Sequence, residues 1–135
     1  MIEIIKISAA GQGLTEITNE INALENLGST GDGLCTVFIQ HTSASLLIQE
    51  NADPSARTDL ENWLNRLVPE NDPLYTHTME GPDDMPAHIK SMLTQSSLSV
   101  PIIQGRLALG TWQGIYLWEH RHGQHQRKII VHLQH

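Results

Sequence analysis

The sequence predicts an α+β fold: a single domain covering residues 1–135, in which largely antiparallel β-sheets form a sandwich-like arrangement with two to three helices. Two observations lead to this class. Helical periodicity is confined to the first two thirds of the chain, whereas the last third is a series of short apolar segments separated by turn residues. The 135 residues are 39% hydrophobic and contain no long linker or repeat, which suits one core.

The first elements are a predicted strand and a predicted helix. Residues 2–7, with the sequence IEIIKI, have the apolar content of a strand. A helix is predicted for residues 14–28 because apolar residues recur there at helical spacing, with Thr15 as the candidate N-cap and Gly28 as a left-handed stop. The spaced apolar residues are Leu14, Ile17, Ile21, Leu24 and Leu27.

Two strands and a second helix are expected next. Residues 33–41 form a predicted buried strand, and residues 43–50 form another after a short polar corner. The helix predicted for residues 53–69 has Asp53 as its N-cap and Pro54 in its first turn. Its inner face is expected to consist of Ala56, Leu60, Trp63, Leu64 and Leu67.

The C-terminal part is predicted to contain a short helix and then only strands. The helix covers residues 85–93, and a hairpin tip is expected at residues 121–126, where polar residues surround a glycine. A run of sequential strands of this kind favours an antiparallel sheet. The predicted strands are residues 98–103, 106–110, 111–120 and 127–134.

Composition restricts the partners and the location of the protein. A formal net charge of -7 argues against bulk attraction to nucleic acid or to anionic lipid. The chain begins without a charged-then-apolar leader and has no apolar run long enough to span a membrane. Cys35, the one cysteine, cannot form an internal disulfide. The simplest expectation is a cytoplasmic protein in a reducing compartment, with no nucleic-acid or membrane partner.

The segment HTMEGPDDMPAHI, residues 77–89, has the densest set of chemically active side chains. Asp84 and His88 are four residues apart, so a helix that starts at Asp84 places both on one face. Such a pair can bind a divalent metal, or the aspartate can orient the imidazole. The alternative is that Asp84 caps the helix and His88 is half-exposed, which Pro86 in the first turn also suits.

His77 and Glu80 precede this helix in a loop that contains Gly81 and Pro82. Such a loop can place His77 over the start of the helix, where free N–H groups and the helix dipole also favour anions. This corner can therefore bind a metal, a phosphate or both. The alternative is a solvated acidic loop.

His41 is a further candidate, since it lies on the same face of its predicted strand as the apolar residues Val37 and Ile39. It would then lie at the edge of the core, where a histidine is more often hydrogen-bonded than catalytic. Hydroxyl side chains follow it directly, and Glu50 and Asn51 lie at the far end of the next strand. Polar groups of this kind at strand ends are typical of a site at the rim of a sheet.

Glu119 is a carboxylate in an apolar strand. By strand alternation it shares a face with Ile115 and Leu117, whereas Tyr116 and Trp118 lie on the opposite face. An unpaired buried carboxylate is costly, so Glu119 is expected to pair with a cation, a histidine or a residue of another subunit.

Histidines are also frequent near the C-terminus. Three of them surround a predicted turn whose only neighbouring carboxylate is Glu119, so His122 and His125 are expected at the surface, as are the last two histidines of the chain. The cations best placed to meet an anionic ligand, each of which could equally be a solvated strand residue, are Arg106, Arg121, Arg127 and Lys128.

Three segments together resemble a known family. They are HTSASLLIQENADPSARTDL (residues 41–60), HTMEGPDDMPAHIKSML (residues 77–93) and GRLALGTWQGIYLWEHR (residues 105–121). In this order, and over nearly the whole chain, they resemble the YjbQ family, which is also described as the secondary thiamine-phosphate synthase family. The LGTWQ block with the upstream DDMPAH is the most specific part. The turn EHRHGQHQR is longer and richer in histidine than the turn expected for the family.

The resemblance implies a small α+β domain that assembles as a homotrimer, with a site near the subunit boundaries. It also implies a weak thiamine-phosphate synthase activity, which joins a pyrimidine methyl pyrophosphate to a thiazole phosphate and releases pyrophosphate. By matching motifs, the implied site residues are His41, Glu50, Asn51, His77, Asp84, His88 and Glu119.

Three hypotheses follow: an enzyme of this type, a metal-assisted hydrolase of a small metabolite with water as the nucleophile, and a non-catalytic trimer that binds a metal or a small anion. The expected ligand is a small phosphorylated molecule. Magnesium suits the carboxylates and zinc suits the histidines, and no organic cofactor is expected. The predicted metal ligands are His41, His77, Asp84 and His88, and the predicted catalytic residues are His41, Glu50, Asn51 and Glu119.

Overall fold

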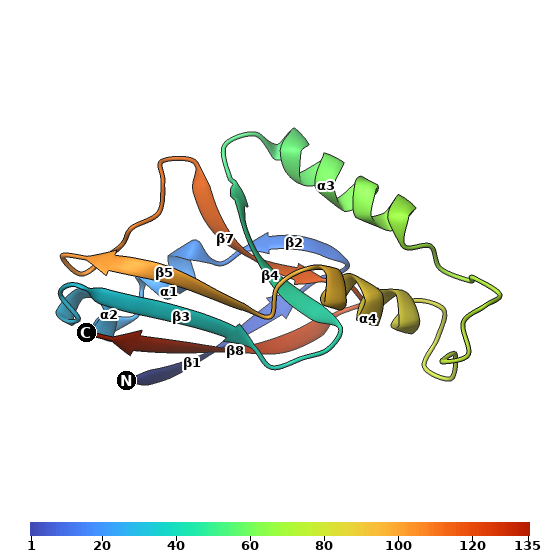
Figure 1. Cartoon of the computed structure of the whole chain (residues 1–135), viewed down its shortest axis with the longest axis horizontal. Coiled ribbons are helices and arrows are strands. Elements are labelled where there is room, and N and C mark those ends of the chain that lie inside the picture. The colour runs from blue at the N-terminus through green and yellow to red at the C-terminus, as the bar shows by residue number, and fades with distance from the viewer.

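Eight β-strands and four helices make up the fold of the computed structural model, which describes residues 1–135. One sheet has five strands in the order β1-β8-β3-β5-β6, the other has three in the order β2-β7-β4, and every pairing within them is antiparallel (Figure 1). The strands are β1 Ile2–Ala9, β2 Gly13–Glu16, β3 Gly33–Ile39, β4 Ala44–Glu50, β5 Ser97–Ile103, β6 Arg106–Leu107, β7 Gln113–Glu119 and β8 His125–Gln134. The helices are α1 Thr18–Asn22, α2 Glu25–Ser29, α3 Pro54–Leu67 and α4 Asp84–Leu93. The predicted α+β class with antiparallel sheets is confirmed.

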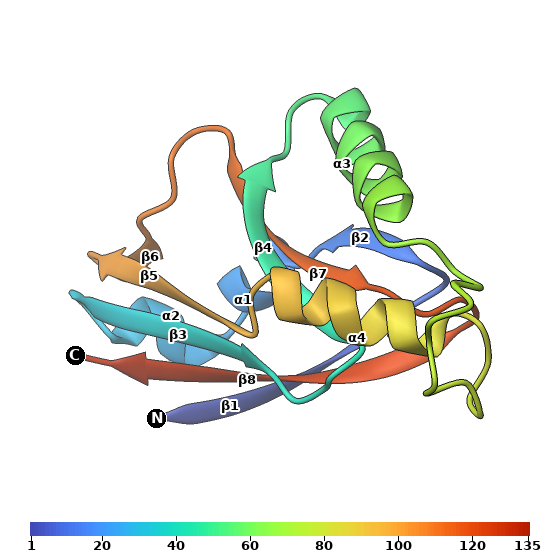
Figure 2. The same cartoon turned by 45° about the vertical axis from the view of Figure 1, so that its right-hand side comes forward.

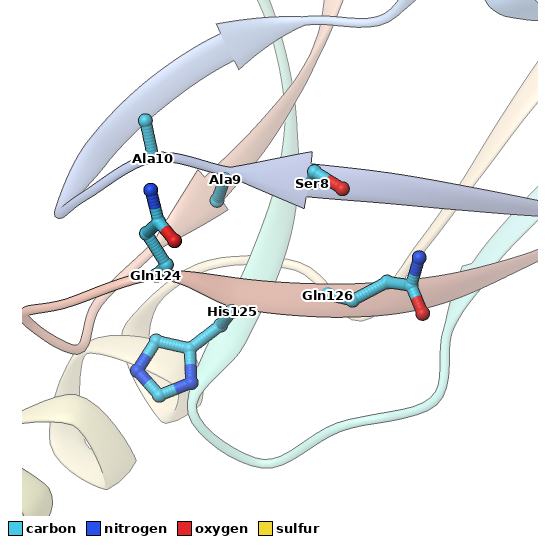
Figure 3. A pocket seen from close by; sticks show the side chains of 6 residues that line it. All are labelled: Ser8, Ala9, Ala10, Gln124, His125 and Gln126. Atoms are coloured by element: carbon cyan, nitrogen blue, oxygen red, sulfur yellow. The ribbon is translucent and has the colours of Figure 1, made fainter.

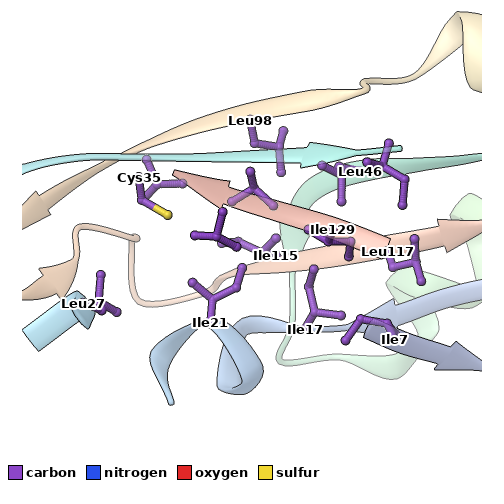
Figure 4. Close-up of a cluster of buried hydrophobic side chains, with 14 of the residues drawn as sticks. Ile7, Ile17, Ile21, Leu27, Cys35, Leu46, Leu98, Ile115, Leu117 and Ile129 are labelled. Carbon is purple, nitrogen blue, oxygen red and sulfur yellow. The ribbon is translucent and has the colours of Figure 1, made fainter. Parts of the chain in front are cut away.

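The main core lies between the two sheets and under the short helices. Burial alternates along β1 and β5, as expected for strands with one face on a core. The cluster contains 18 buried residues. Ile115 of β7 and Ile129 of β8, both labelled in Figure 4, have no exposed surface. Full burial of such an aliphatic side chain stabilises the fold by about 1.5–3 kcal/mol relative to leaving it exposed.

Strand β7 is buried on both faces, as the predicted alternation requires. Ile115 and Leu117 belong to the main core. The opposite face of β7 packs against the end of α3 in a second cluster made of Leu14, Leu64, Val68, Tyr116 and Trp118. Because both faces and both edges of this strand are covered, it holds the residues that follow it in a fixed position.

Helix α3 begins where the sequence predicts. Asp53 caps it, since its Oδ1 accepts a hydrogen bond from Ser55 N at 2.9 Å, and a proline is its first residue. The inner face is narrower than predicted: Leu64 is buried, whereas Trp63 and Leu67 are 55% and 53% exposed. With 14 residues α3 is the longest helix, and no helix is long and apolar enough to cross a membrane.

The helix predicted for residues 14–28 is wrong. Residues 13–16 form β2, in which Thr15 pairs with Leu117 of β7 instead of capping a helix. The five-residue helices α1 and α2 follow separately, so the chain has four short helices instead of two to three. Gly28 lies inside α2, and Gly31 takes the left-handed conformation with a φ of 72°. Pairing with the free edge of β7 satisfies the backbone of this segment, which outweighs its helical periodicity.

The outer face of the five-stranded sheet has an apolar row that runs across three neighbouring strands. Ile4 of β1 pairs with Ile130 of β8, which pairs in turn with Phe38 of β3. Ile4 is 59% exposed and Phe38 is 42% exposed. This apolar row, defined as Ile4, Ile130 and Phe38, is therefore open to solvent at both of its ends.

Candidate metal centre

Three side chains at the start of helix α4 converge on one point. Figure 2 shows helix α4 and the loop that precedes it. Asp84 is the first residue of α4, His88 lies one turn later, and His77 comes from that loop. Nε2 of His77 lies 2.8 Å, and Nε2 of His88 lies 3.2 Å, from the same oxygen, Oδ2 of Asp84. The centroids of the two imidazole rings are 5.3 Å apart. The structure thus brings together three of the four predicted metal ligands.

The donor atoms of this cluster fit a divalent ion. One atom from each of the three side chains lies within 4.8 Å of the other two. Two ligand atoms bound to one zinc ion at about 2.0–2.2 Å are themselves roughly 3–3.5 Å apart. The distance of 3.2 Å between His88 and Asp84 matches this range, whereas the distance of 2.8 Å between His77 and Asp84 is that of a direct hydrogen bond and must lengthen slightly around an ion. Two imidazoles and one carboxylate favour zinc or a similar ion, because magnesium prefers a shell of oxygen atoms.

His88 is oriented by a backbone contact. Its Nδ1 lies 3.0 Å from the carbonyl oxygen of Thr42. A carbonyl oxygen can only accept, so Nδ1 donates the proton and the neutral ring has its lone pair at Nε2. That lone pair faces Oδ2 of Asp84, an arrangement that is repulsive unless a proton or a cation lies between the two atoms. Metal-bound histidines usually donate their second N–H to a carbonyl or carboxylate in this way.

Asp84 is 1% exposed and is held in its charged form. Arg121 Nη1 donates to Oδ1 of Asp84 at 2.9 Å, which leaves Oδ2 for the two histidines. Burial by itself raises the pKa of Asp84. The charge of His88, the hydrogen bond of His77 and the charge of Arg121 outweigh burial, and the pKa of Asp84 is lowered.

Arg121 connects α4, its preceding loop and the end of β7. Its Nε donates to Oδ2 of Asp83 at 3.0 Å and its Nη2 to the carbonyl oxygen of Glu80 at 2.9 Å, while its backbone N–H donates to Glu119. Asp83 occupies the N-cap position of α4, so the alternative in which Asp84 caps the helix is wrong. Arg121 was predicted to meet an anionic ligand, but it is engaged by carboxylates of the chain itself.

Glu119 is fully buried and paired, which confirms the prediction that it finds a cation. Its Oε1 accepts from Arg127 Nε at 2.6 Å and its Oε2 from Arg127 Nη2 at 2.8 Å. Oε2 also accepts from the backbone N–H of Arg121 at 3.0 Å. With both oxygens engaged, Glu119 positions the two arginines rather than contacting a ligand.

His41 lies outside the cluster, contrary to its prediction as a metal ligand. Strand β3 ends at Ile39, so His41 lies beyond the strand and not on its apolar face. Its Nδ1 accepts a hydrogen bond from Ser43 N at 3.0 Å, and Arg127 Nη1 lies 2.9 Å from its Nε2. Partial burial and the charge of Arg127 lower the pKa of His41, so its ring is neutral at pH 7.

Two pockets lie on either side of the cluster. His41 and His88 line a pocket of about 330 Å³ whose other walls are Thr42, Ala44, Ser91, Met92 and Ser96. His77 lines a second pocket of about 290 Å³, together with Asn71, Asp72, Tyr75, Thr78, Gly81, Pro82 and Met85. The first pocket is rich in hydroxyl groups, and both are of a size that suits a small ligand.

Glu50 and Asn51 are not brought to this site within one chain. In β4, Ala44 pairs with Glu119 next to the cluster, whereas Glu50 pairs with Gln113 at the other end of the strand. At about 3.3 Å per residue, the two ends of β4 are roughly 20 Å apart. Asn51 Nδ2 donates to Oε2 of Glu16 at 3.0 Å instead. Their predicted grouping with the histidines is therefore not met by a single chain.

The structure also places the C-terminal histidines. His122 is exposed and lies 2.6 Å from Glu70, and His125 lines a separate shallow pocket between the end of β1 and the start of β8 (Figure 3). His120, by contrast, is 1% exposed, with its Nε2 2.8 Å from Ser45 Oγ and its Nδ1 without a partner. Burial, followed by the charges of Lys90 and Arg127, lowers the pKa of His120 to about 3.

Residues 3–135 match the family model described as UPF0047 protein YjbQ-like. A UPF0047 protein of Synechocystis is 53% identical over 131 residues, which cover 97% of this chain and 89% of that protein. The UPF0047 protein YjbQ of Escherichia coli O157:H7 is 46% identical, with 96% and 94% covered. The sequence relationship thus extends over nearly the full length of the chain.

Solved structures agree in fold. A conserved hypothetical protein of Thermus thermophilus superposes with a TM-score of 0.86 at 35% identity, covering 97% of this chain and 98% of that one. An uncharacterised YjbQ/UPF0047 protein of Clostridium acetobutylicum gives a TM-score of 0.83 at 37% identity, with 98% of both chains covered. These descriptions name a family and no activity. From sequence and fold together, the chain belongs to the YjbQ (UPF0047) family.

Proposed function

We propose that this chain is a metal-dependent enzyme that acts on a small phosphorylated metabolite. The observation that supports it is the cluster at the start of α4, where two imidazole nitrogens approach one buried carboxylate oxygen. His77, Asp84 and His88 would hold the ion, and zinc is the ion that these donors favour. When bound there, it would supply Lewis-acid polarisation of a phosphoryl or carbonyl oxygen.

The residues around the cluster have separate tasks in this proposal. The carbonyl oxygen of Thr42 holds the ring of His88, and Arg121 holds the carboxylate of Asp84. His41 lines the same pocket as His88 and is neutral at pH 7, so it can accept a proton from a nucleophile bound there once the nucleophile replaces the hydrogen bond from Ser43 N to its Nδ1. The hydroxyl groups of Thr42 and Ser96 can donate to phosphoryl oxygens, whereas that of Ser91 already donates to the carbonyl oxygen of Ala44.

Hydrolysis is the reaction that the charges favour. Arg121 and Arg127, the arginines nearest the cluster, are engaged by Asp83, Asp84 and Glu119, so neither is free to stabilise a departing pyrophosphate. Water would then be the nucleophile. One observation favours the narrower thiamine-phosphate synthase activity that the family resemblance implies: the two pockets beside the cluster would accommodate two small substrates.

Removal of either histidine is expected to abolish metal binding and turnover. Protein purified without a tag or chelator should contain close to one zinc ion per chain by elemental mass spectrometry, and His77→Ala and His88→Ala should contain almost none. Turnover of phosphate esters should fall by at least about 100-fold in both variants, since even supporting residues of a metal site are worth 10–100-fold. His135→Ala, at the exposed C-terminus, is the matched control.

The same assay separates the alternatives. Phosphate release without a second organic substrate indicates hydrolysis, whereas pyrophosphate release that requires a thiazole phosphate indicates the synthase. Bound metal without turnover in either assay indicates the non-catalytic trimer. If wild-type protein binds no zinc or magnesium, or both variants keep full turnover with an intact fold, the proposal is wrong.

The family resemblance further leads us to propose a cytoplasmic homotrimer. The apolar row of Ile4, Ile130 and Phe38 supports an assembly of copies, because exposed apolar contacts of this kind are commonly buried between subunits. Phe38→Glu is then expected to yield monomers by light scattering where the wild type gives trimers. A monomeric wild-type protein would contradict this assembly.

A further inference from the structure

A pocket on the far side of helix α4 has features of a second binding site. It has a volume of about 390 Å³, and its walls include residues from the end of α3, from the loop before β2 and from α4. Lys90 lies two residues after His88, which corresponds to a rotation of about 200° around the helix axis. Lys90 and the metal-ligand candidate His88 therefore lie on roughly opposite faces of α4. The walls of the pocket are Gln12, Asn65, Val68, Pro69, Glu70, Lys90 and His122.

Lys90 is a buried cation that the chain leaves without a carboxylate partner. It is 3% exposed and takes part in none of the ion pairs of the structure. Its Nζ donates one hydrogen bond, to Oδ1 of Asn65, although an ammonium group has three donors. Burying an ammonium group with only one of its three donors engaged is costly, unless a bound partner accepts hydrogen bonds from the other two.

The neighbouring amides are arranged to present a donor beside Lys90. Because Oδ1 of Asn65 accepts from Lys90, its Nδ2 is the donor end, and it contacts Oε1 of Gln12 at 3.5 Å. Gln12 is fixed in turn, since its Nε2 donates to the carbonyl oxygen of His120 at 3.0 Å. Two N–H groups of Lys90 and the second N–H of Asn65 remain without a protein acceptor.

We propose that this pocket binds a small oxyanion, a carboxylate or a phosphoryl group, through Nζ of Lys90 and Nδ2 of Asn65. The oxyanion would supply the acceptors that the buried ammonium lacks, and the pocket is large enough for the small molecule that bears it. Glu70 lies at the rim, paired with His122 at 2.6 Å. Its negative charge limits the site to weakly charged ligands. This site is separate from the metal centre and does not depend on the reaction proposed there.

Thermal unfolding of the full-length chain with inorganic phosphate and with acetate tests the proposal. Chloride at equal ionic strength and pH is the reference, and EDTA removes any contribution of bound metal. At least one oxyanion should raise the Tm in a saturable manner. The one that does so at lower concentration identifies the chemistry of the site. The rise should persist in His88→Ala, which lacks a metal ligand.

Variants of the pocket separate specific binding from bulk salt effects. Lys90→Met should weaken oxyanion binding by at least about tenfold, the usual loss for a hydrogen bond to a charged group. Lys128→Met removes one exposed lysine of β8 and should leave binding unchanged. Glu70→Gln removes a negative charge from the pocket and should therefore tighten oxyanion binding by about two- to fivefold. A purely structural role of Lys90 would not produce this change.

A second measurement covers the case in which Lys90→Met does not fold. Asn65→Asp keeps the oxygen that accepts from Lys90 but replaces the donor Nδ2 by a charged oxygen, so it should abolish the rise in Tm that the oxyanion produces. If neither phosphate nor acetate raises the Tm, or if the rise survives in a folded Lys90→Met, the proposal is overturned. A rise in Tm that is as large in a folded Asn65→Asp as in the wild type also overturns it.

Discussion

Replacing Arg127 by methionine is expected to lower the free energy of unfolding by about 3–5 kcal/mol, the usual loss when one partner of a buried ion pair is removed. Arg127 is 6% exposed and donates twice to Glu119, which has no exposed surface. The substitution leaves that carboxylate in the core with a single backbone donor, from Arg121. Urea unfolding at pH 7, followed by tryptophan fluorescence, measures the loss.

Two comparisons show whether the unpaired charge is the cause. Arg106→Met removes an exposed arginine from β6 and should change stability by less than about 0.5 kcal/mol. The double variant Glu119→Gln with Arg127→Met has no buried charge at this point, so it should regain much of the loss. If Arg127→Met alone loses less than about 1 kcal/mol, Glu119 is not the buried, charged partner that the geometry indicates.

The other large effect is a loss of stability in acid that depends on His120. The pKa of this residue is lowered to about 3 by burial, Lys90 and Arg127. Below about pH 6.5 the unfolded chain binds a proton that the native state does not bind. Stability should therefore fall with pH by up to about 1.4 kcal/mol per unit, until the native state also binds the proton. Unfolding free energies between pH 7 and pH 5 measure this slope.

His120→Gln removes the titrating group while keeping a polar side chain next to Ser45. Between pH 7 and pH 5, the free energy of unfolding of this variant should change less steeply with pH than that of the wild type, by about 1 kcal/mol per pH unit. His135→Gln, at the exposed end of the chain, should keep the wild-type slope. The lowered pKa values of Asp83 and Asp84 add stability that is lost only in stronger acid, below about pH 5. Equal slopes for wild type and His120→Gln would contradict a neutral, buried His120.

The strands and the two longer helices could be predicted because their signals are local. Period-two burial in β5 and the Asp–Pro start of α3 follow from a few neighbouring residues. The segment of residues 14–28 could not be resolved in this way. Its apolar spacing suits a helix, but Leu14 faces the cluster under α3 whereas Ile17 and Ile21 face the main core. Only the position of β7, which comes much later in the sequence, separates these two environments.

The part of the candidate site that lies within one turn of helix α4 could be predicted from the sequence. Asp84 and His88 follow from their spacing, and His77 from its loop. The hydrogen bond from Arg121 to Asp84 was not predicted. Arg121 follows β7, and the sequence does not indicate how far the end of β7 lies from the start of α4. The signal that could have indicated it is the pair of adjacent acids at the start of α4, which needs a nearby cation. His120 was missed because strand burial continues one residue past β7.

The position of β8 has a consequence for how the chain folds. Ile2 pairs with His132, and β8 lies between β1 and β3, so the five-stranded sheet cannot close until β8 is available. Arg121, which holds Asp84, also comes late. A nascent chain on the ribosome therefore has all three metal-ligand candidates, and Thr42, before it has Arg121. Pairing of segments this far apart in the sequence makes folding slow, and the site is completed only after Arg121 has been added to the chain.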